Sequence, residues 1–559
     1  MTISAAEQLL FELINRARLD PLAEAARLGI GLNDGLRAGT INGSAKQALA
    51  PNDLLEIAAQ GHSEWMLEAD TFSHTGRGGS TAFQRMEAAG YDFLSPWASG
   101  ENIAFFGSTR VADEVKTIAA LHENLFRSAG HRENILNADF RELGVAMVAG
   151  AYTDKSSGIT YNGSYMLTEN FAASGTPLFI TGVVHDDRDG NDFYTPGEGV
   201  SGTLFLAAGR RAASAEAGGY ALRLPDGTGQ RGLVDVEIVT TQGKMTLALD
   251  MAGQNAKLDV VDGTALRLSS SAVLGDGISA ASLLGVADLS LTGGAASERL
   301  TGNSGANLLA GGEGDDSILG ADGNDTIYAG LGDDFIGGGA GNDLIYGGDG
   351  ANTIYAGAGN DTVQGGAGND TIYGSAWRNA LLGNDGNDVI YTSAAGDFAA
   401  GGAGNDMVLG GAGDDTIYAG LGDDFIGGGE GNDLIFAGAG TNRIYGGFGD
   451  DTLHAGAGRD VMTGSPGADT FVFAFAAHAG IGAGRDVITD FTPGEDHIDL
   501  TGLGTVFNGQ AGLTGGGQAS FYFYAPLGLV IGDQNGDGGA DWVLELSGVQ
   551  AVSAGDFLL

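Results

Sequence analysis

A strict repeat of nine residues occupies the middle of the chain and restricts its fold more than any other feature. From residue 302 to residue 472 the sequence divides into 19 nonamers without insertion, and residues 311–319 (GGEGDDSIL) are a clean example. Position 8 is apolar throughout, and position 6 is aspartate in 15 units and asparagine in four. A flexible glycine-rich linker would show no fixed period. The segment is therefore predicted to be an ordered repeat structure.

The nonamer has the length of one tight turn and one short strand. Six glycine-rich residues form a turn with left-handed positions that glycine occupies without strain. The remaining three residues form a strand whose middle side chain points inward. Two nonamers then complete an 18-residue coil, and successive coils stack about 4.8 Å apart through parallel strand pairing.

The stacked turns predict calcium sites. Position 6 of one unit meets position 6 of the unit 18 residues later, and each gap between turns gathers carbonyl oxygens and carboxylates, the ligands that Ca²⁺ prefers. Of 17 such gaps, ten have aspartate on both sides, so on the order of ten ions are expected. Asparagine at 307, 352, 379 and 442 weakens the other seven. The predicted ligands are Asp316, Asp325, Asp334, Asp343, Asp361, Asp370, Asp388, Asp397, Asp406, Asp415, Asp424, Asp433, Asp451, Asp460 and Asp469.

One edge of the repeat carries two irregular neighbouring turns. Trp377 and Ala395 replace the glycine of position 4, and Asn379 removes a charge from position 6. A residue with a Cβ is costly where glycine holds a left-handed backbone. The gaps beside Asn379 and above Asp397 are therefore predicted to be empty or distorted, with Trp377 projecting at the rim.

The repeat and the segment after it resemble a known class of secreted proteins. The nonamers resemble the RTX (repeats-in-toxin) parallel β-roll. Residues 467–473 (GADTFVF), residues 490–500 (DFTPGEDHIDL) and the end Asp556-Phe-Leu-Leu559 resemble the C-terminal cap of serralysin-type proteases. The resemblance implies export by a type I secretion apparatus with an uncleaved C-terminal signal, and hence an extracellular protein. Deleting residues 556–559 is expected to remove little core. No His-Glu-x-x-His motif occurs, so zinc-protease activity is not implied.

Two further loops carry oxygen ligands at alternating positions. The first has Asp187, Asp189, Asn191 and Glu198 at positions 1, 3, 5 and 12, and it resembles the calcium loop of β-sandwich modules of bacterial surface proteins. The second has Asp533, Asn535, Asp537 and Asp541 at positions 1, 3, 5 and 9, and Leu544 at position 12 supplies no carboxylate. The alternative for both loops is an acidic turn without metal.

Composition excludes several classes of function. The 26 basic and 71 acidic residues give a net charge of −45, which disfavours binding to nucleic acid. The chain has no cysteine, so disulfides and thiolate metal sites are absent. No apolar run reaches the roughly 18 residues of a membrane-spanning helix. The first residues lack the basic and apolar regions of a cleaved secretion signal.

The first 174 residues show the pattern of an ordinary globular domain. Ser4 and Glu7 form a predicted capping box before an amphipathic helix that Asp20-Pro21 ends, and residues 54–66 predict a second helix. Residues 72–74 (FSH), 99–104 (SGENIA) and 128–136 (SAGHRENIL) follow, and two strands are predicted near residues 143 and 165. This ordered set resembles the bacterial SCP-like branch of the CAP superfamily, an α-β-α sandwich.

The CAP resemblance implies a cleft that holds a divalent cation. His74, Glu101 and His131 match three of the four family positions, and the fourth falls on Ser128. Three ligands would leave Zn²⁺ an open position, with Glu101 the candidate general base. The alternative is that both histidines are structural. His62 and His122 are interpreted as surface or packing residues, and Glu123 as a weaker replacement for the missing acid.

The predicted fold is therefore multidomain. It comprises a CAP-like domain (1–174), a small β-sandwich-like module with the acidic loop (175–283), the β-roll (284–472) and a β-rich cap with the secretion signal (473–559). The favoured function is a secreted calcium-binding protein whose CAP-like cleft binds a metal, a lipid or a cell-envelope component. The alternatives are an extracellular metal-assisted hydrolase and a structural surface or biofilm protein.

Overall fold

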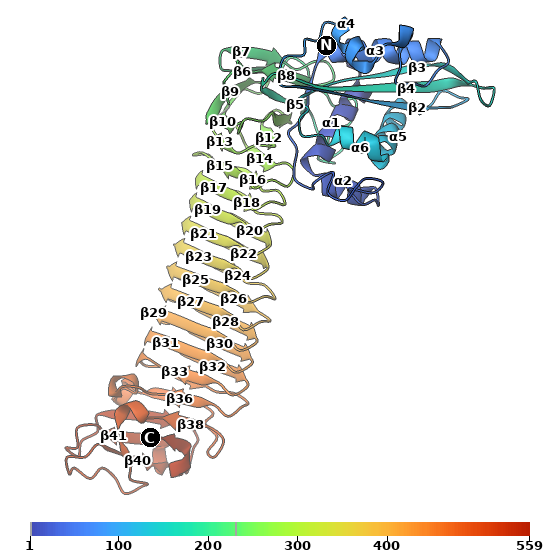
Figure 1. Cartoon of the computed structure of the whole chain (residues 1–559). Helices are drawn as coiled ribbons and strands as arrows, with labels where there is room; N and C mark the ends of the chain where they lie inside the picture. Colours follow the sequence, from blue (N-terminus) through green and yellow to red (C-terminus); the bar gives the residue numbers. More distant parts are fainter. Residues whose placement is uncertain (1–2, 230–231) are drawn as a thin grey trace. The chain divides into compact units, whose positions relative to one another are not determined.

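The structure, a computed structural model, describes residues 3–229 and 232–559. They divide into two compact units, Met1–Gly294 with Glu298–Ala306, and Ala295–Ser297 with Asn307–Leu559 (Figure 1). Within the described residues, no helix combines the length and the apolar character that crossing a membrane requires.

The N-terminal domain is a sheet covered by helices on both faces. Its strands follow the order β1-β3-β4-β2, with β1 parallel to β3 and the other pairs antiparallel. The strands are β1 (Ala50–Pro51), β2 (Trp97–Phe106), β3 (Glu142–Asp154) and β4 (Ile159–Ser174). The helices are α1 (Ala5–Leu19), α2 (Pro21–Arg27), α3 (Asp53–Glu68), η1 (Arg77–Gly79), α4 (Ala82–Ala88), α5 (Glu114–Arg127) and α6 (Ala129–Ile135). The predicted α-β-α sandwich is confirmed.

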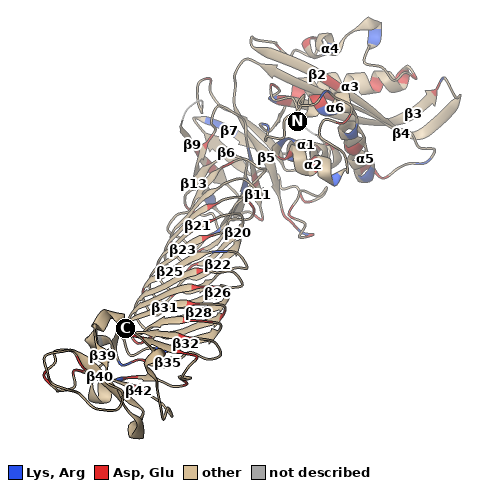
Figure 2. Ribbon diagram, turned by 60° about the horizontal axis from the view of Figure 1, so that its bottom comes forward, with Lys and Arg blue, Asp and Glu red and all other residues tan. Residues whose placement is uncertain are grey.

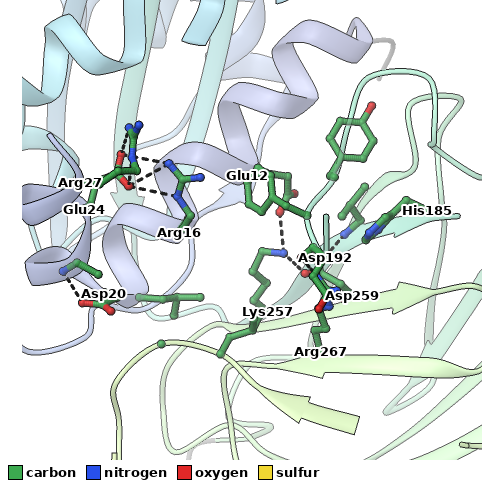
Figure 3. A pocket seen from close by; sticks show the side chains of 17 residues that line it. Glu12, Arg16, Asp20, Glu24, Arg27, His185, Asp192, Lys257, Asp259 and Arg267 are labelled. Atoms are coloured by element: carbon green, nitrogen blue, oxygen red, sulfur yellow. Dashed lines mark hydrogen bonds and ion pairs between the residues drawn. The ribbon is translucent and has the colours of Figure 1, made fainter. Parts of the chain in front are cut away.

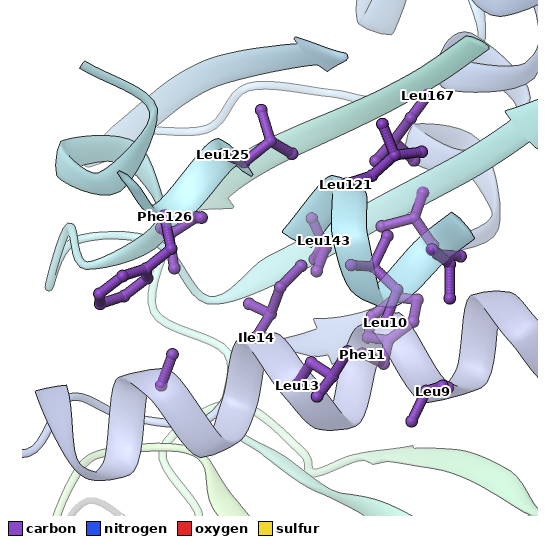
Figure 4. Packing of buried hydrophobic residues seen from close by; sticks show 14 of the residues in the cluster. Leu9, Leu10, Phe11, Leu13, Ile14, Leu121, Leu125, Phe126, Leu143 and Leu167 are labelled. Carbon is purple, nitrogen blue, oxygen red and sulfur yellow. The ribbon is translucent and has the colours of Figure 1, made fainter. Parts of the chain in front are cut away.

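Helix α1 shows how the sequence builds one of these layers. Ser4 and Glu7 form the capping box, in which each side chain accepts the other residue's backbone N–H. The apolar stripe of α1 is buried against α5 and the sheet (Figure 4). Leu10, Ile14 and Phe126 are fully buried in this core. Helix α3 covers the opposite face, where Leu55 and Met66 pack.

Residues 175–283 form short strands in two sheets. β5 pairs with β8 and β11, while β9 pairs with β6 and β10. Parallel stacking already begins here, because β12 pairs with β14, β14 with β16, and β13 with β15. The solenoid pattern thus starts upstream of residue 284. The strands are β5 (Phe179–His185), β6 (Leu204–Ala207), β7 (Arg210–Ala213), β8 (Gly219–Arg223), β9 (Leu233–Val239), β10 (Lys244–Asp250), β11 (Ala256–Val261), β12 (Ala265–Leu268), β13 (Ala272–Leu274), β14 (Ala280–Leu283), β15 (Ser290–Thr292) and β16 (Arg299–Thr301).

The nonamers form a parallel β-solenoid with two sheets. Each strand pairs in parallel with the strand 18 residues later, as Ile327 does with Ile345. The first sheet contains β17 (Leu308–Glu313), β19 (Thr326–Leu331), β21 (Leu344–Asp349), β23 (Thr362–Ala367), β25 (Ala380–Asp385), β27 (Phe398–Ala403), β29 (Thr416–Leu421), β31 (Leu434–Gly440), β33 (Thr452–His454), β34 (Ala457–Gly458) and β36 (Thr470–Val472). The second contains β18 (Ser317–Leu319), β20 (Phe335–Ala340), β22 (Thr353–Ala358), β24 (Thr371–Tyr373), β26 (Val389–Ser393), β28 (Met407–Ala412), β30 (Phe425–Glu430), β32 (Arg443–Phe448) and β35 (Val461–Thr463).

The strands are longer than the sequence predicted. Most span six residues rather than three, because the first three residues of the following nonamer continue the strand. Two positions per strand therefore face inward, namely position 8 and position 1 of the following nonamer. Leu309 and Gly311 are an example. Position 2 stays paired although its backbone is left-handed, as at Gly330 opposite Gly348.

The C-terminal segment closes the solenoid with strands and 3₁₀ turns. β38 pairs with β36 and β43, and the hairpin β41–β42 joins β37. Asp556 and Phe557 are buried, and the Phe557 ring contacts Phe507 and Phe521. The expectation that residues 556–559 add little core was therefore wrong. The elements are η2 (Ala476–His478), η3 (Gly482–Gly484), β37 (Asp486–Ile488), β38 (His497–Asp499), η4 (Thr501–Leu503), β39 (Val506–Phe507), β40 (Ser520–Tyr524), η5 (Ala525–Leu527), β41 (Leu529–Asp533), β42 (Trp542–Leu546), η6 (Ala554–Asp556) and β43 (Phe557–Leu558).

Candidate functional site

The position-6 side chains form a ladder along each edge of the solenoid. The Oδ1 atom of each accepts the backbone N–H of the position-6 residue 18 residues earlier. The distances are 2.8 Å from Asp316 N to Asp334 Oδ1 and 2.8 Å from Asp370 N to Asp388 Oδ1. Acidic residues, coloured red on the ribbon, recur at successive turns of the solenoid (Figure 2). Each position 6 thus faces its counterpart one coil away.

In 13 aspartates of this ladder the second carboxylate oxygen has no hydrogen-bond partner. The Oδ2 atoms are buried and unpartnered in Asp325, Asp334, Asp343, Asp361, Asp370, Asp388, Asp406, Asp415, Asp424, Asp433, Asp451, Asp460 and Asp469. Each lies beside the position-1 residue of its own unit. A Cβ on Gly383 would come within 3.0 Å of both Asp388 Oδ2 and the carbonyl oxygen of Gly401. Carboxylate and carbonyl oxygens thus converge around one small space, a donor set that fits Ca²⁺.

Burial makes these carboxylates costly without a cation. Desolvation raises the pKa of Asp388 to about 7, although the Asp370 N–H lowers it. The same cause raises the pKa of Asp415 to about 8, and neighbouring aspartates add to the rise. A bound cation favours the ionised form and offsets the repulsion between turns. The residues present therefore fit the ion that the sequence predicts.

A second ladder of hydrogen bonds, at position 5, was not predicted from the sequence. Exposed asparagine or aspartate side chains there accept the backbone N–H of position 5 in the following coil. Asn342 N donates to Asn324 Oδ1 at 2.8 Å, and Asp333 N donates to Asp315 Oδ1 at 2.9 Å. These bonds run opposite to those of position 6. The recurrence of Asn and Asp at position 5 every nine residues is the sequence pattern from which these hydrogen bonds could have been predicted.

The irregular edge differs as its sequence predicted. β24 ends at Tyr373 after three residues, whereas its neighbours continue through the turn. The Asn379 side-chain amide donates to the carbonyl oxygen of Trp377 at 2.8 Å, which places an N–H donor where aspartate offers an oxygen. Asp397 Oδ2 accepts the Ser393 N–H. Trp377 is exposed at the surface. These turns therefore lack the converging carboxylate and carbonyl oxygens of the regular turns.

The ladders continue beyond the nonamers into the C-terminal segment. Asp460 N donates to Asp486 Oδ1 at 2.7 Å, and Asp469 N donates to Asp496 Oδ1 at 3.0 Å. Asp486 Oδ2 is also buried and unpartnered. The sequence analysis missed both residues because the spacing changes from 18 to 26 and 27. The triplets 486–488 (DVI) and 496–498 (DHI) repeat the pattern of positions 6 to 8 and were the available signal.

The first oxygen-rich loop is assembled around three carboxylates. Ligand oxygens of Asp187, Asp189 and Glu198 all lie within 4.8 Å of one another. Glu198 is buried, and its oxygens accept the N–H groups of Arg188 and Thr195. Asn191, the fourth predicted ligand, turns its Oδ1 to the Phe193 N–H instead.

The second oxygen-rich loop is closed by its own hydrogen bonds. It connects β41 to β42, and Asp533 accepts the N–H groups of Gly536 and Gly538. Asp541 accepts those of Gln534 and Asn535. Asn535 and Asp537 likewise accept backbone N–H groups two residues on. Within the described part of the chain, the three aspartates Asp533, Asp537 and Asp541 form no three-ligand group.

The CAP residues form an ion-pair cluster. His74 Nδ1 lies 2.9 Å from Glu101 Oε1, and the Arg85 guanidinium pairs with Glu101 Oε2. Glu101 is almost fully buried, and His62 Nε2 lies 4.0 Å from its Oε1. Over residues 3–229 and 232–559, His74, Glu101 and His131 do not gather within the 4.8 Å that links the loop carboxylates. Arg85, which the sequence analysis missed, already neutralises the carboxylate.

His131 instead faces a cavity of about 460 Å³. Phe72, Phe105, Tyr152 and Tyr161 line this cavity together with Ser128. Burial lowers the pKa of His131, so the ring is neutral near pH 7. The aromatic lining suits an apolar ligand.

The remaining candidates of this domain have structural partners. His62 Nε2 lies 3.0 Å from the Ser73 carbonyl oxygen, and His122 Nε2 lies 3.2 Å from Glu24 Oε1. Arg27 donates to Glu123 at 2.9 Å, which holds Glu123 away from the place of the missing acid.

Neutralising Glu101 is expected to destabilise the N-terminal domain. Glu101→Gln leaves the Arg85 guanidinium, only 12% exposed, beside a neutral amide. Loss of one partner of a buried pair costs about 3 kcal/mol. Chemical denaturation followed by near-ultraviolet circular dichroism measures the change. The double variant with Arg85→Met should recover part of the loss, and an unchanged midpoint in Glu101→Gln would contradict the assigned pairing.

Two families match this chain. Residues 11–171 match the CAP family, described as the Cysteine-rich secretory protein family. Six segments between residues 292 and 471 match the RTX calcium-binding nonapeptide repeat. A similar curated protein is the Uncharacterized membrane protein YlbC of Bacillus subtilis (strain 168), 37% identical over 95 residues. That match covers 17% of this chain and 24% of YlbC, so the chain spans about a quarter of this relative.

Proposed function

Because residues 11–171 form a CAP domain and residues 292–471 form an RTX calcium-binding β-solenoid, we propose that this is a secreted protein that folds on extracellular calcium. The unpartnered Oδ2 atoms of the position-6 ladder support this most directly. On the order of ten ions occupy the gaps with aspartate on both sides. The loop of Asp187, Asp189 and Glu198 holds one more.

Calcium dependence gives the solenoid a role in export. In the cytoplasm free Ca²⁺ is scarce, so the acidic repeat stays unfolded and passes a type I secretion channel. Outside the cell, ions bind between the turns and the chain folds. The intact mass of protein recovered from the medium tests the uncleaved signal, and loss of an N-terminal peptide would contradict it.

The CAP domain is the ligand-binding part of this proposal. The aromatic cavity beside His131 fits a lipid or an apolar cell-envelope component. A hydrolase with Glu101 as general base is less well supported, because that carboxylate already pairs with Arg85. Zn²⁺ at His74, Glu101 and His131 would require these side chains to move closer together, because in the described part of the chain they form no three-ligand group.

Exchanging aspartate and asparagine at position 6 tests the calcium sites. Asp388→Asn is expected to lower the bound calcium by up to two equivalents, because Asp388 borders two gaps. Asn352→Asp is the matched opposite change and should raise it by up to two. Equilibrium dialysis with elemental analysis measures both variants. Stoichiometries equal to that of the parent in both would contradict the assignment.

A further inference from the structure

A cavity of about 510 Å³ lies in the first unit between α1, α2 and the strands β5 and β11 (Figure 3). This is within the ~300–1,000 Å³ range of small-molecule sites. Helices α1 and α2 belong largely to the CAP match, whereas β5 and β11 lie in residues 172–291, which neither family match covers. The cavity is therefore a feature of this combination of segments.

All lysine and arginine side chains of the cavity wall are paired with carboxylates. Lys257 Nζ lies 2.7 Å from Glu12 Oε2 and also pairs with Asp259 (Figure 3). Arg16 and Arg27 both pair with Glu24, and Arg267 pairs with Asp192. A charged ligand that reached the buried pairs of Lys257 would have to break one of them or enter without a partner, which is costly.

Two buried polar side chains of the wall have no partner. Both ring nitrogens of His185 and the hydroxyl of Tyr194 lack a hydrogen bond, although the residues are only 1% and 2% exposed. Their ring centroids lie 6.1 Å apart and the two rings meet edge to face. Buried polar groups are nearly always hydrogen-bonded, and each exception requires an explanation.

The unpartnered atoms define what a ligand must offer. The imidazole ring of His185, when neutral, presents one N–H donor and one acceptor nitrogen. The Tyr194 hydroxyl adds a second donor. Around them Leu19, Val183 and Phe193 supply apolar wall. The cavity thus combines a polar end with an apolar body.

We propose that this cavity binds an uncharged, mainly apolar small molecule whose hydroxyl or carbonyl group hydrogen-bonds to His185 and Tyr194. The ligand enters beside Ala23 of α2, which is exposed and lines the cavity.

Fluorescence titration of the calcium-loaded full chain with Prodan tests the proposal. Prodan is an uncharged naphthalene dye with one ketone carbonyl, and its emission moves to the blue in apolar surroundings. The parent protein should show saturable, blue-shifted binding. Tyr194→Phe should weaken this binding about three- to tenfold, the effect of one neutral hydrogen bond.

Two tryptophan variants on the same helix place the dye. Ala23→Trp should fill the entrance and abolish saturable binding, whereas Ala26→Trp, equally exposed but outside the cavity wall, should leave it unchanged. Absence of saturable binding by the parent would overturn the proposal. So would retention of the parent's affinity in Ala23→Trp, or an unchanged affinity in Tyr194→Phe.

Discussion

Chelating calcium with EGTA is expected to abolish most of the β-sheet circular dichroism that the solenoid contributes. Both edges stack buried carboxylates 18 residues apart, and their second oxygens have no partner. An uncompensated buried charge costs several kcal/mol. The combined cost of more than ten such charges exceeds the free energy of unfolding of a typical domain, which is ~5–15 kcal/mol. Adding calcium back should restore the signal, and a native-like β spectrum in EGTA would contradict this prediction.

The N-terminal domain provides the internal control for the same experiment. Its core is apolar and built from α1, α5 and the sheet, without an acidic repeat. Near-ultraviolet signals of Trp65 and Trp97 should therefore persist in EGTA. Loss of these signals together with the solenoid would show that this domain also depends on calcium.

Gly404→Ala is expected to destabilise the solenoid by about 3 kcal/mol. Gly404 holds a φ of 133°, and a Cβ there would overlap the Gly386 carbonyl oxygen of the previous coil. The left-handed backbone costs about 1–2 kcal/mol and the forced shift of the neighbouring turn about 1–3 kcal/mol. Denaturation at saturating calcium measures the loss.

Gly494→Ala separates the two causes. Gly494 also has a positive φ, of 87°, but nothing lies within 4 Å of its Cβ position. The Gly494→Ala variant should therefore lose only about 1 kcal/mol of stability, the cost of the left-handed backbone. Equal losses of stability in both variants would mean that the close stacking of the turns adds nothing to the cost of the substitution at Gly404. Trp377 and Ala395 show how the chain tolerates larger residues at position 4, because their turns abandon the left-handed backbone.

Features that repeat or act locally were predictable from the sequence. The period of nine placed the inward side chains of position 8 and the facing pairs of position 6, since parallel stacking repeats every contact. The capping box of Ser4 and Glu7 also acts within one helical turn. The aberrant turn at Asn379 followed from the same local chemistry.

Features that depend on distant segments were not predictable from spacing. Arg85 reaches Glu101 from a different element, and no motif connects the two. Asp486 joins the ladder only after the period has changed, and Phe557 is buried by strands that lie far away in sequence. The cavity at His185 forms where helix α1 meets strands of another segment. Tertiary packing decides each of these cases.

A crystal structure of the full chain at millimolar calcium tests the central claim most directly, namely that ions lie between position-6 aspartates. Ordered ions are expected in nine of the ten gaps with aspartate on both sides, all except the gap between Asp397 and Asp415, and each ion is bound by an Oδ2 atom and turn carbonyls. The two gaps that touch Asn379 should hold none. Well-ordered ions beside Asn379, or empty gaps along Asp370, Asp388 and Asp406, would contradict the account.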